Sequence, residues 1–268
     1  MGKTDETFHH VVSLISNMTF KYENKKLKQG FCYIIGCDEV GRGCLAGPVV
    51  AAAVVFDRLK IKDKGLRIVE IKDSKLLTAG KREELSENIK TNALVWGVGV
   101  VSQEVVDEIN IHNATLLAMR KAVEGLIAPS GVIPSAAEES LIEGVTTAKG
   151  SLHSSDALLG RDDTKNVLLV IDGKFTIPSF DKATEGEPKL NMEQEAVIGG
   201  DNKILSIAAA SIIAKVYRDE LMRKLHQQYP IYNFAQHKGY GTLFHRTMIL
   251  QNGLSPIHRK SFCKNLAI

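Results

Sequence analysis

The stretch FCYIIGCDEVGRGCLAGPVVAAAVVF, residues 31–56, contains two apolar runs that are separated by a glycine-rich loop. The first run, FCYIIGCD, is typical of a buried strand, and PVVAAAVVF indicates a second strand after the loop. Two carboxylates, Asp38 and Glu39, stand side by side where the first run ends, and Arg42 follows between two glycines. Because carboxylates at the end of an apolar strand have no role in a core, this loop is the first candidate for function.

The acidic pair also makes a geometric prediction. Neighbouring residues of a regular strand point to opposite faces, so Asp38 and Glu39 cannot point the same way inside one. We therefore expect the first strand to stop or bulge at Asp38. Glu39 would then enter the turn and could swing back beside its neighbour, whereas a regular strand through Glu39 would argue against a shared site.

The remaining apolar patterns predict an α/β fold with a mixed sheet. Thr78 is expected to cap a helix that runs to about Thr91. Further strands are indicated at residues 92–102 and 166–173, with a short one at 193–203. Helices are indicated at residues 111–126, at 204–229 before Pro230, and at 241–253 with Gly253 past the end.

Two segments do not fit this alternation. Residues 1–30 are expected to be an N-terminal extension, in which Phe8 to Met18 form a short helix and a lysine-rich linker follows. Residues 31–268 would form the main domain. Inside it, residues 127–165 are rich in Ser, Gly, Ala, Pro and Thr, which predicts a mobile insertion.

Composition indicates an ordinary soluble globular protein. The chain has 268 residues, 44% of them hydrophobic, and a formal net charge of +3, which does not by itself indicate nucleic acid. The four cysteines form no CxxC pair and are expected to be reduced thiols. There is no secretory signal pattern and no apolar run of the ~20 residues that a membrane helix needs, so we expect a cytoplasmic protein.

Two further carboxylates belong to apolar elements. Asp172 ends the run VLLVID before Gly173, and Asp219 lies late in the long helix, at four-residue spacing from Lys215 and Ser211. Clustered carboxylates repel one another and stay ionised only beside cations, and Mg²⁺ prefers oxygen ligands. Two such ions roughly 3.5–4 Å apart can stabilise the attacking and the leaving oxygen of a phosphodiester displacement. The alternative is structural, with Asp172 as a turn acid and Asp219 as a surface residue.

Several segments together resemble one family. Their order along the chain and their residues look like the signature blocks of bacterial ribonuclease HII, the type 2 ribonuclease H. The resemblance covers residues 33–262, except that residues 127–165 are unmatched. The short N-terminal segment and Asp219 distinguish the chain from ribonuclease HIII. The blocks are GCDEVGRGCLAGPVVAAAVV, KDSKLL, INIHNATLLAM, VIDG, IGGDNK, AAASIIAKVYRDELM, HKGYGT and SPIHRKSF.

The resemblance implies a fold, an activity and a substrate. The fold would be a ribonuclease H-like mixed β-sheet flanked by helices, with a C-terminal helical segment. The enzyme would be a monomeric endonuclease that hydrolyses the RNA strand of RNA–DNA hybrids. It would also cut 5′ of single ribonucleotides embedded in duplex DNA, leaving 3′-hydroxyl and 5′-phosphate ends. Such an enzyme serves ribonucleotide removal from DNA and RNA primer removal.

The resemblance also implies site residues. The four catalytic, metal-binding acids fall on Asp38, Glu39, Asp172 and Asp219, which would hold two Mg²⁺ or Mn²⁺ ions. In the implied mechanism Asp38 bridges both ions, Glu39 and Asp172 bind one, and Asp219 holds the other. The substrate-binding residues are Gly41, Arg42 and Gly43 at the ribose 2′-hydroxyl, Tyr240 on the next sugar, and Lys75, Ser211, Lys215 and Arg218 near phosphates.

Two other functions remain open from the residues. A protein that binds hybrids without turnover would lack one of the acids, and none is missing. A phosphatase for small phosphoesters would not need the G-R-G loop or Tyr240. His237, His245 and His258 are expected on exposed loops or helices and are not assigned as metal ligands, because the acids suffice.

Overall fold

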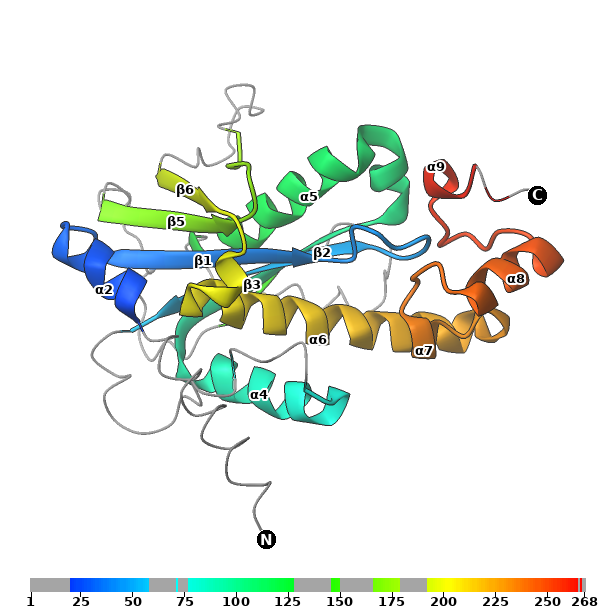
Figure 1. Cartoon of the computed structure of the whole chain (residues 1–268), viewed down its shortest axis with the longest axis horizontal. Coiled ribbons are helices and arrows are strands. Elements are labelled where there is room, and N and C mark those ends of the chain that lie inside the picture. Colours follow the sequence, from blue (N-terminus) through cyan, green and yellow to red (C-terminus); the bar gives the residue numbers. More distant parts are fainter. Residues whose placement is uncertain are drawn as a thin grey trace, which may run out of the picture.

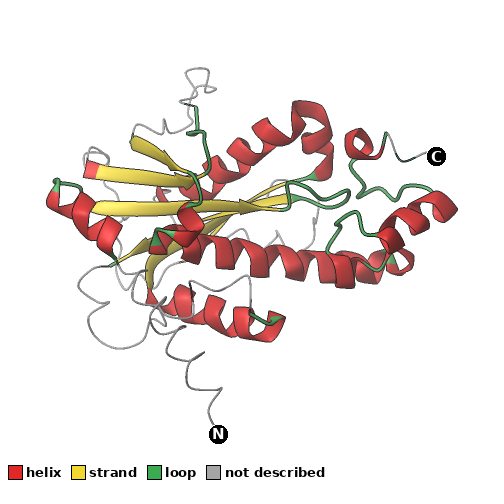
Figure 2. Ribbon diagram, in the orientation of Figure 1, coloured by secondary structure: helices red, strands yellow, loops and turns green. Residues whose placement is uncertain are grey.

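The computed structural model describes residues 20–57, 71, 77–127, 146–149, 166–178, 192–264 and 266. Within these residues, six strands form one sheet in the order β4-β3-β2-β1-β5-β6 (Figures 1 and 2). The neighbouring pairs β1–β2, β2–β3 and β3–β4 are antiparallel, whereas β5 pairs parallel with β1 and with β6. The expected mixed sheet is therefore confirmed. The strands are β1 (Tyr33–Val40), β2 (Val49–Phe56), β3 (Ala93–Val101), β4 (Thr146–Lys149), β5 (Val167–Asp172) and β6 (Glu193–Val197).

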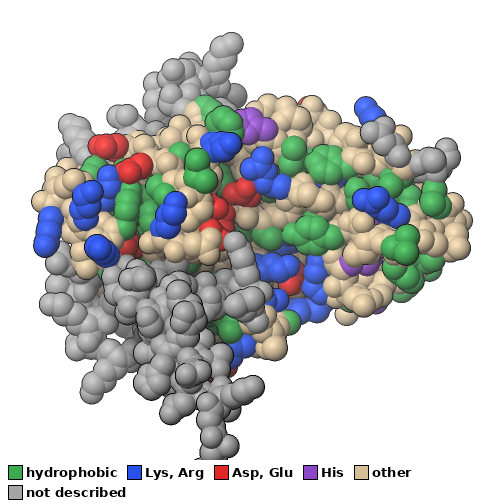
Figure 3. All heavy atoms as spheres, in the orientation of Figure 1, with side chains coloured by type: hydrophobic (Ala, Val, Ile, Leu, Met, Phe, Trp, Pro, Cys, Tyr) green, Lys and Arg blue, Asp and Glu red, His purple; other side chains and the backbone are tan. Residues whose placement is uncertain are grey.

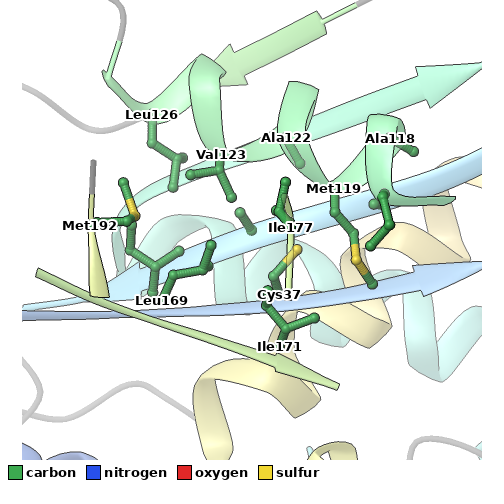
Figure 4. Close-up of a cluster of buried hydrophobic side chains, with 14 of the residues drawn as sticks. Cys37, Ala118, Met119, Ala122, Val123, Leu126, Leu169, Ile171, Ile177 and Met192 are labelled. Atoms are coloured by element: carbon green, nitrogen blue, oxygen red, sulfur yellow. The ribbon is translucent and has the colours of Figure 1, made fainter. Parts of the chain in front are cut away.

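Helices cover both faces of the sheet (Figure 1). Odd-numbered residues of β2, from Val49 to Val55, join the hydrophobic cluster under α5 (Gln103–Ile127), part of which Figure 4 shows. Even-numbered residues, from Val50 to Val54, join the cluster under α6 (Leu205–Gln228) and α4 (Ala79–Asn92). A strand buried on both faces needs apolar residues at every position, which explains the uninterrupted run VVAAAVV.

The predicted boundaries of three helices agree with the structure, whereas α5 begins at Gln103, before the predicted residue 111, and is interrupted at Asn110, which has φ +67° and ψ +163°. The Thr78 hydroxyl accepts a hydrogen bond from the Lys81 N–H at 3.4 Å and caps α4. α6 ends before Pro230, and Gly253 follows α8 (Leu243–Asn252) with φ +76°. The C-terminal helical segment gathers beyond the β1–β2 loop (Figure 1). Besides α8 it contains η5 (Pro230–Tyr232), α7 (Phe234–His237) and α9 (Lys260–Cys263).

The prediction of a lysine-rich linker is wrong, because Lys21–Lys28 form helix α2. Its Glu23 is buried, and one carboxylate oxygen accepts hydrogen bonds from the backbone N–H and the hydroxyl of Ser206, at 3.0 and 3.1 Å. Glu23 thus provides a partner for one backbone N–H group in the first turn of α6, because the N-cap residue of this helix makes no capping hydrogen bond with its side chain. The helix expected at Phe8 to Met18 lies outside the described residues.

Part of the expected insertion belongs to the sheet. Residues 146–149 form β4, which pairs antiparallel with β3 from Trp96 to Gly99. The sequence pattern missed this strand because TTAK is short and lacks apolar alternation. Residues 128–145 and 150–165 lie outside the described part of the chain.

Two expectations from composition can be compared with the structure. Among the described residues, none of the helices combines the length and the hydropathy of a membrane-spanning segment. All four cysteines are free, and three of them are buried. Cys37 packs as a small apolar side chain in the cluster under α5.

α6 packs directly against β1 at Gly36. A Cβ built on Gly36 would lie 2.2 Å from the carbonyl carbon of Ser206 and 2.4 Å from the backbone nitrogen of Ile207. These are backbone atoms, which cannot turn away as a flexible side chain could. The absence of a side chain at Gly36 therefore sets how closely the helix approaches the strand.

We predict that Gly36→Ala lowers the free energy of unfolding by about 3 kcal/mol, at the upper end of the cost of overpacking. Urea unfolding without divalent ions measures this effect. Gly80→Ala is the matched control, because a Cβ there meets nothing within 4 Å and alanine favours α4. An equal, small effect of both substitutions would contradict the direct contact of helix and strand.

Candidate active site

β1 continues as a regular strand through both acids, so the prediction that it stops or bulges at Asp38 is wrong. Asp38 pairs with Ala52, Glu39 with Ala51, and the ladder to β2 runs on to Val40. On the other side of β1, the ladder to β5 ends at Cys37 and Ile171. The acids therefore follow the end of the parallel ladder, beside the residue that comes next on β5, Asp172.

The two acids nevertheless interact with each other and with Asp172. Burial raises the pKa of Asp38 well above its ordinary value, and repulsion by Glu39 and then Asp172 raises it further. Burial also raises the pKa of Glu39, with a contribution from Asp172, while Arg42 opposes that rise. Strand alternation fixes the direction of a Cβ but not the position of a carboxylate two bonds beyond it, which is why the geometric prediction failed.

Local hydrogen bonds hold Asp38 and Asp172. The Glu39 N–H donates to Asp38 Oδ1 at 2.8 Å, and a hydrogen bond with the Ser211 side chain lowers the pKa of Asp38 against the larger effect of burial. Asp172 Oδ1 accepts from the Gly200 N–H at 2.7 Å. Gly173 then leaves the strand with φ +114°, a sharp exit that glycine permits.

α6 runs beside β1 and brings Asp219 to the glycine loop. Ser206 contacts Gly36 near its start, and a Cβ on Gly41 would lie 2.2 Å from Nε of Arg218 further along. The helix advances about 18 Å between these two residues and the strand about 17 Å between its two glycines. Because these two distances are nearly equal, Arg218 lies at Gly41 just as Ser206 lies at Gly36. Asp219 is the next residue of α6 after this contact with the loop.

Asp219 is buried and already paired. Lys215 Nζ donates to its Oδ1 at 2.7 Å, which is the helix salt bridge that the four-residue spacing allowed. Arg42 likewise pairs with Glu39 at 3.1 Å. Within the described ranges, no three His, Cys, Asp or Glu side chains are arranged as a ready-made metal site. Protein cations therefore balance two of the four acids in this structure.

The donor chemistry still fits hard divalent cations. Asp38, Glu39 and Asp172 offer carboxylate oxygens only, and two of them have raised pKa values because burial and mutual repulsion disfavour their charges. A divalent ion would relieve that repulsion. Figure 3 shows acidic side chains gathered near the middle of this face, with Lys and Arg side chains beside them.

The glycine loop lies against Tyr240. Cys44 and Tyr240 form an isolated β-bridge, and the Leu45 N–H donates to the Gly239 carbonyl at 2.8 Å. Gly43 is exposed with open space where a Cβ would be, and Tyr240 is 42% exposed. The structure thus places the G-R-G loop beside the expected sugar-stacking tyrosine, with a surface that a ligand can approach.

Buried histidines hold the Tyr240 segment, contrary to the expectation of exposed ones. His245 and His258 are buried, and His245 Nδ1 lies 2.9 Å from the Tyr240 carbonyl, to which it must donate. His245 Nε2 then accepts from His258 Nε2 at 3.0 Å, and His258 Nδ1 accepts from the Ser255 N–H at 2.9 Å. Burial lowers the pKa of each imidazole to about 4, so both are neutral at pH 7.

The four predicted phosphate contacts have different positions. Ser211 and Lys215 lie beside Asp38 and Asp219, as described above. Lys75 lies outside the described residues. Arg218 is fully buried, and its guanidinium donates to the Pro48, Ala46 and Lys238 carbonyls, so it cannot reach a phosphate. The sequence did not reveal this, because a helical Arg before Asp219 is usually exposed.

Comparison with known proteins gives one consistent family. The model of the family Ribonuclease HII matches residues 35–160 and 164–265, which includes most of the segment that we could not place. The ribonuclease HII of Alkaliphilus metalliredigens is 41% identical over 244 residues, covering 91% of this chain and 96% of that protein.

Solved structures show the same fold. The ribonuclease HII of Archaeoglobus fulgidus, solved in a complex with PCNA, matches with a TM-score of 0.57 at 23% identity, over 85% of this chain and 94% of that one. Bst ribonuclease HIII, solved with Mn²⁺, matches with a TM-score of 0.57 at 18% identity, over 85% of this chain and 65% of that one.

We predict that Asp38→Asn stabilises the protein when divalent ions are absent, because it removes a buried, repelled charge. Since the pKa of Asp38 is raised by folding, the wild-type stability falls as pH rises through that pKa, and the variant lacks this fall. Thermal unfolding in EDTA at pH 8 should show a higher midpoint for the variant, and about 1 kcal/mol corresponds to roughly 2–4 °C.

The exposed acid Glu87, paired with Lys90 at 2.7 Å, provides the control. Glu87→Gln should change the stability by less than about 0.5 kcal/mol. An Asp38→Asn variant that is less stable than the wild type at pH 8 would show that the acids do not repel one another in the folded protein.

Proposed function

The chain belongs to the ribonuclease HII family and is a metal-dependent ribonuclease H, and on this premise we propose its substrates and mechanism. It hydrolyses the RNA strand of RNA–DNA hybrids and cuts duplex DNA on the 5′ side of a single embedded ribonucleotide. The products carry 3′-hydroxyl and 5′-phosphate ends. The observation that supports this most is one strand, β1, that carries the buried Asp38 and the partly buried Glu39 and leads directly into the glycine loop, where Arg42 and Gly43 are exposed.

Two divalent ions, Mg²⁺ or Mn²⁺, would be held by the four acids. Asp38 would serve both ions, Glu39 and Asp172 one, and Asp219 the other. Bound ions would supply the positive charge that activates water and stabilises the departing 3′-oxygen. The Gly200 N–H keeps one Asp172 oxygen in place, and Ser211 does the same for Asp38.

Two cations of the protein would then change partners. Lys215 balances Asp219 and Arg42 balances Glu39 in the structure. With metal ions held by these carboxylates, the Lys215 and Arg42 side chains would be available to contact the phosphates of the substrate. Such contacts position the nucleic acid without reading its sequence.

Recognition of the ribose is assigned to the glycine loop. The backbone of Gly41, Arg42 and Gly43 would approach the 2′-hydroxyl in the shallow minor groove of an A-like duplex. Tyr240, whose ring is partly exposed beside the loop, would stack on the sugar of the following nucleotide. An enzyme of this kind acts as a monomer in the cytoplasm. There it removes RNA primers, and it also removes single ribonucleotides from DNA.

The experiment is hydrolysis of a hybrid that carries a label on its RNA strand. We expect cleavage with Mg²⁺ or Mn²⁺ and none in EDTA. Asp38→Asn and Asp172→Asn should each lose more than a hundredfold in rate, since even outer partners of metal ligands cost about 10–100-fold. Glu87→Gln should cleave like the wild type. Full activity of either acid variant, or cleavage that continues in EDTA, would overturn the proposal.

A further inference from the structure

Two arginines lie fully buried beneath the glycine loop. Arg218 comes from α6 and Arg259 from the residue before α9, and neither side chain is exposed. Among the described residues, neither guanidinium forms a salt bridge with a carboxylate. Burial, and then the charge of Arg218, lower the pKa of Arg259 to about 10. Two buried cations with no carboxylate in direct contact are costly to stability, which suggests that they have a role.

Both guanidiniums bind carbonyl groups of one loop. Arg259 donates from Nε and Nη2 to the Gly47 carbonyl, at 3.0 and 2.8 Å, and from Nη1 to the Arg42 carbonyl at 2.9 Å. Arg218 donates from Nε to the Pro48 carbonyl at 3.0 Å and from Nη2 to the Ala46 carbonyl at 3.2 Å. The loop that joins β1 to β2 is therefore held from below by two planar groups.

This arrangement sets the direction of one backbone N–H group. In a planar trans peptide the carbonyl of one residue and the N–H of the next point in opposite directions. Since the Arg42 carbonyl points inward to Arg259, the N–H of Gly43 points outward. Gly43 is exposed, and its N–H makes no hydrogen bond to another described residue. A Cβ at Gly43 would meet nothing within 4 Å, so the surface around this donor is open.

The loop backbone also has no space to move inward when a ligand approaches. Gly41 has φ +95° and already lies on the Arg218 side chain, which would be 2.2 Å from a Cβ there. The Phe262 ring in turn lies 5.2 Å from the Arg259 guanidinium and supports it by a cation–π contact. The donor at Gly43 is thus presented from a rigid base.

We propose that Arg259, supported by Arg218, is a positioning residue for ribose recognition. By holding the Arg42 carbonyl inward, it presents the Gly43 N–H to the oxygen of a ribose 2′-hydroxyl. This inference rests on the proposed function, because it assigns the orientation of the recognition loop and not the chemistry of cleavage. Arg259 itself does not touch the substrate.

The experiment compares two duplexes that differ by one oxygen atom. Dissociation constants are measured in EDTA for a DNA duplex with one central ribonucleotide and for the identical all-DNA duplex. The readout is the ratio of the two constants. Arg259→Lys keeps the charge but cannot reach both carbonyls, whereas Arg223→Lys alters an exposed arginine that pairs with Glu83 and serves as the control.

The wild type and Arg223→Lys should bind the ribonucleotide duplex more tightly than the all-DNA duplex. Arg259→Lys should lose about five- to tenfold in affinity for the ribonucleotide duplex only, the worth of one hydrogen bond. A purely structural role would lower the folded fraction and weaken binding of both duplexes equally. The milder Phe262→Leu should reduce the same ratio to a smaller extent, and it provides the test if Arg259→Lys does not fold.

Two outcomes would overturn the inference, and they are distinguishable. If the wild type shows a preference that Arg259→Lys and Phe262→Leu retain in full, Arg259 does not position the donor while the proposed function stands. If the wild type itself binds both duplexes equally, recognition of the 2′-hydroxyl by this loop fails, and the proposed function loses that part.

Discussion

The contact between α6 and β1 at Gly36 determines how the rest of the site is arranged. Because no side chain separates the two backbones there, helix and strand start in register and advance by nearly equal distances. Ser211 then interacts with Asp38, and Arg218 lies under Gly41. An acid on a helix and a recognition loop after a strand are thus brought to one end of the sheet by a single close approach.

The same end of the sheet holds charges that the protein itself does not fully compensate. Asp38 and Glu39 are disfavoured by burial and by their repulsion, and Arg218 and Arg259 are buried with carbonyl groups as their partners. Such features lower the stability of the free protein. They are reasonable at a site where metal ions and a polyanionic substrate supply the missing charges, and so a cost in stability accompanies the function.

Much of the fold could be predicted from the sequence, because local patterns determine it. Apolar runs gave most strands, the Thr78 hydroxyl marked the start of α4, and Pro230 marked the end of α6. Asp172 was selected because a carboxylate at the end of an apolar strand needs an explanation. These inferences use only neighbours in the sequence, which is where the physical cause lies.

The rest depends on contacts between distant residues. The polar segment at Lys21–Lys28 reads as a linker, yet Glu23 anchors it to the start of α6. His258 was expected on an exposed loop or helix, yet the C-terminal segment buries it, together with Arg259, against the β1–β2 loop. Glu39 was misplaced because strand alternation says nothing about where a long side chain ends. Burial of polar groups by long-range packing was the information that the sequence alone did not contain.

The central claim is that β1 carries Asp38 and Glu39 and leads directly into the loop that we propose recognises the ribose, so the cut should lie at a fixed distance from that ribose. The most direct measurement maps the cut in a series of DNA duplexes of one sequence, in which a single ribonucleotide is moved one position at a time. With Mg²⁺ present, the cut should move with the ribonucleotide and stay on its 5′ side. A cut that stays at one place in the DNA sequence, or varies in distance from the ribonucleotide, would contradict the account.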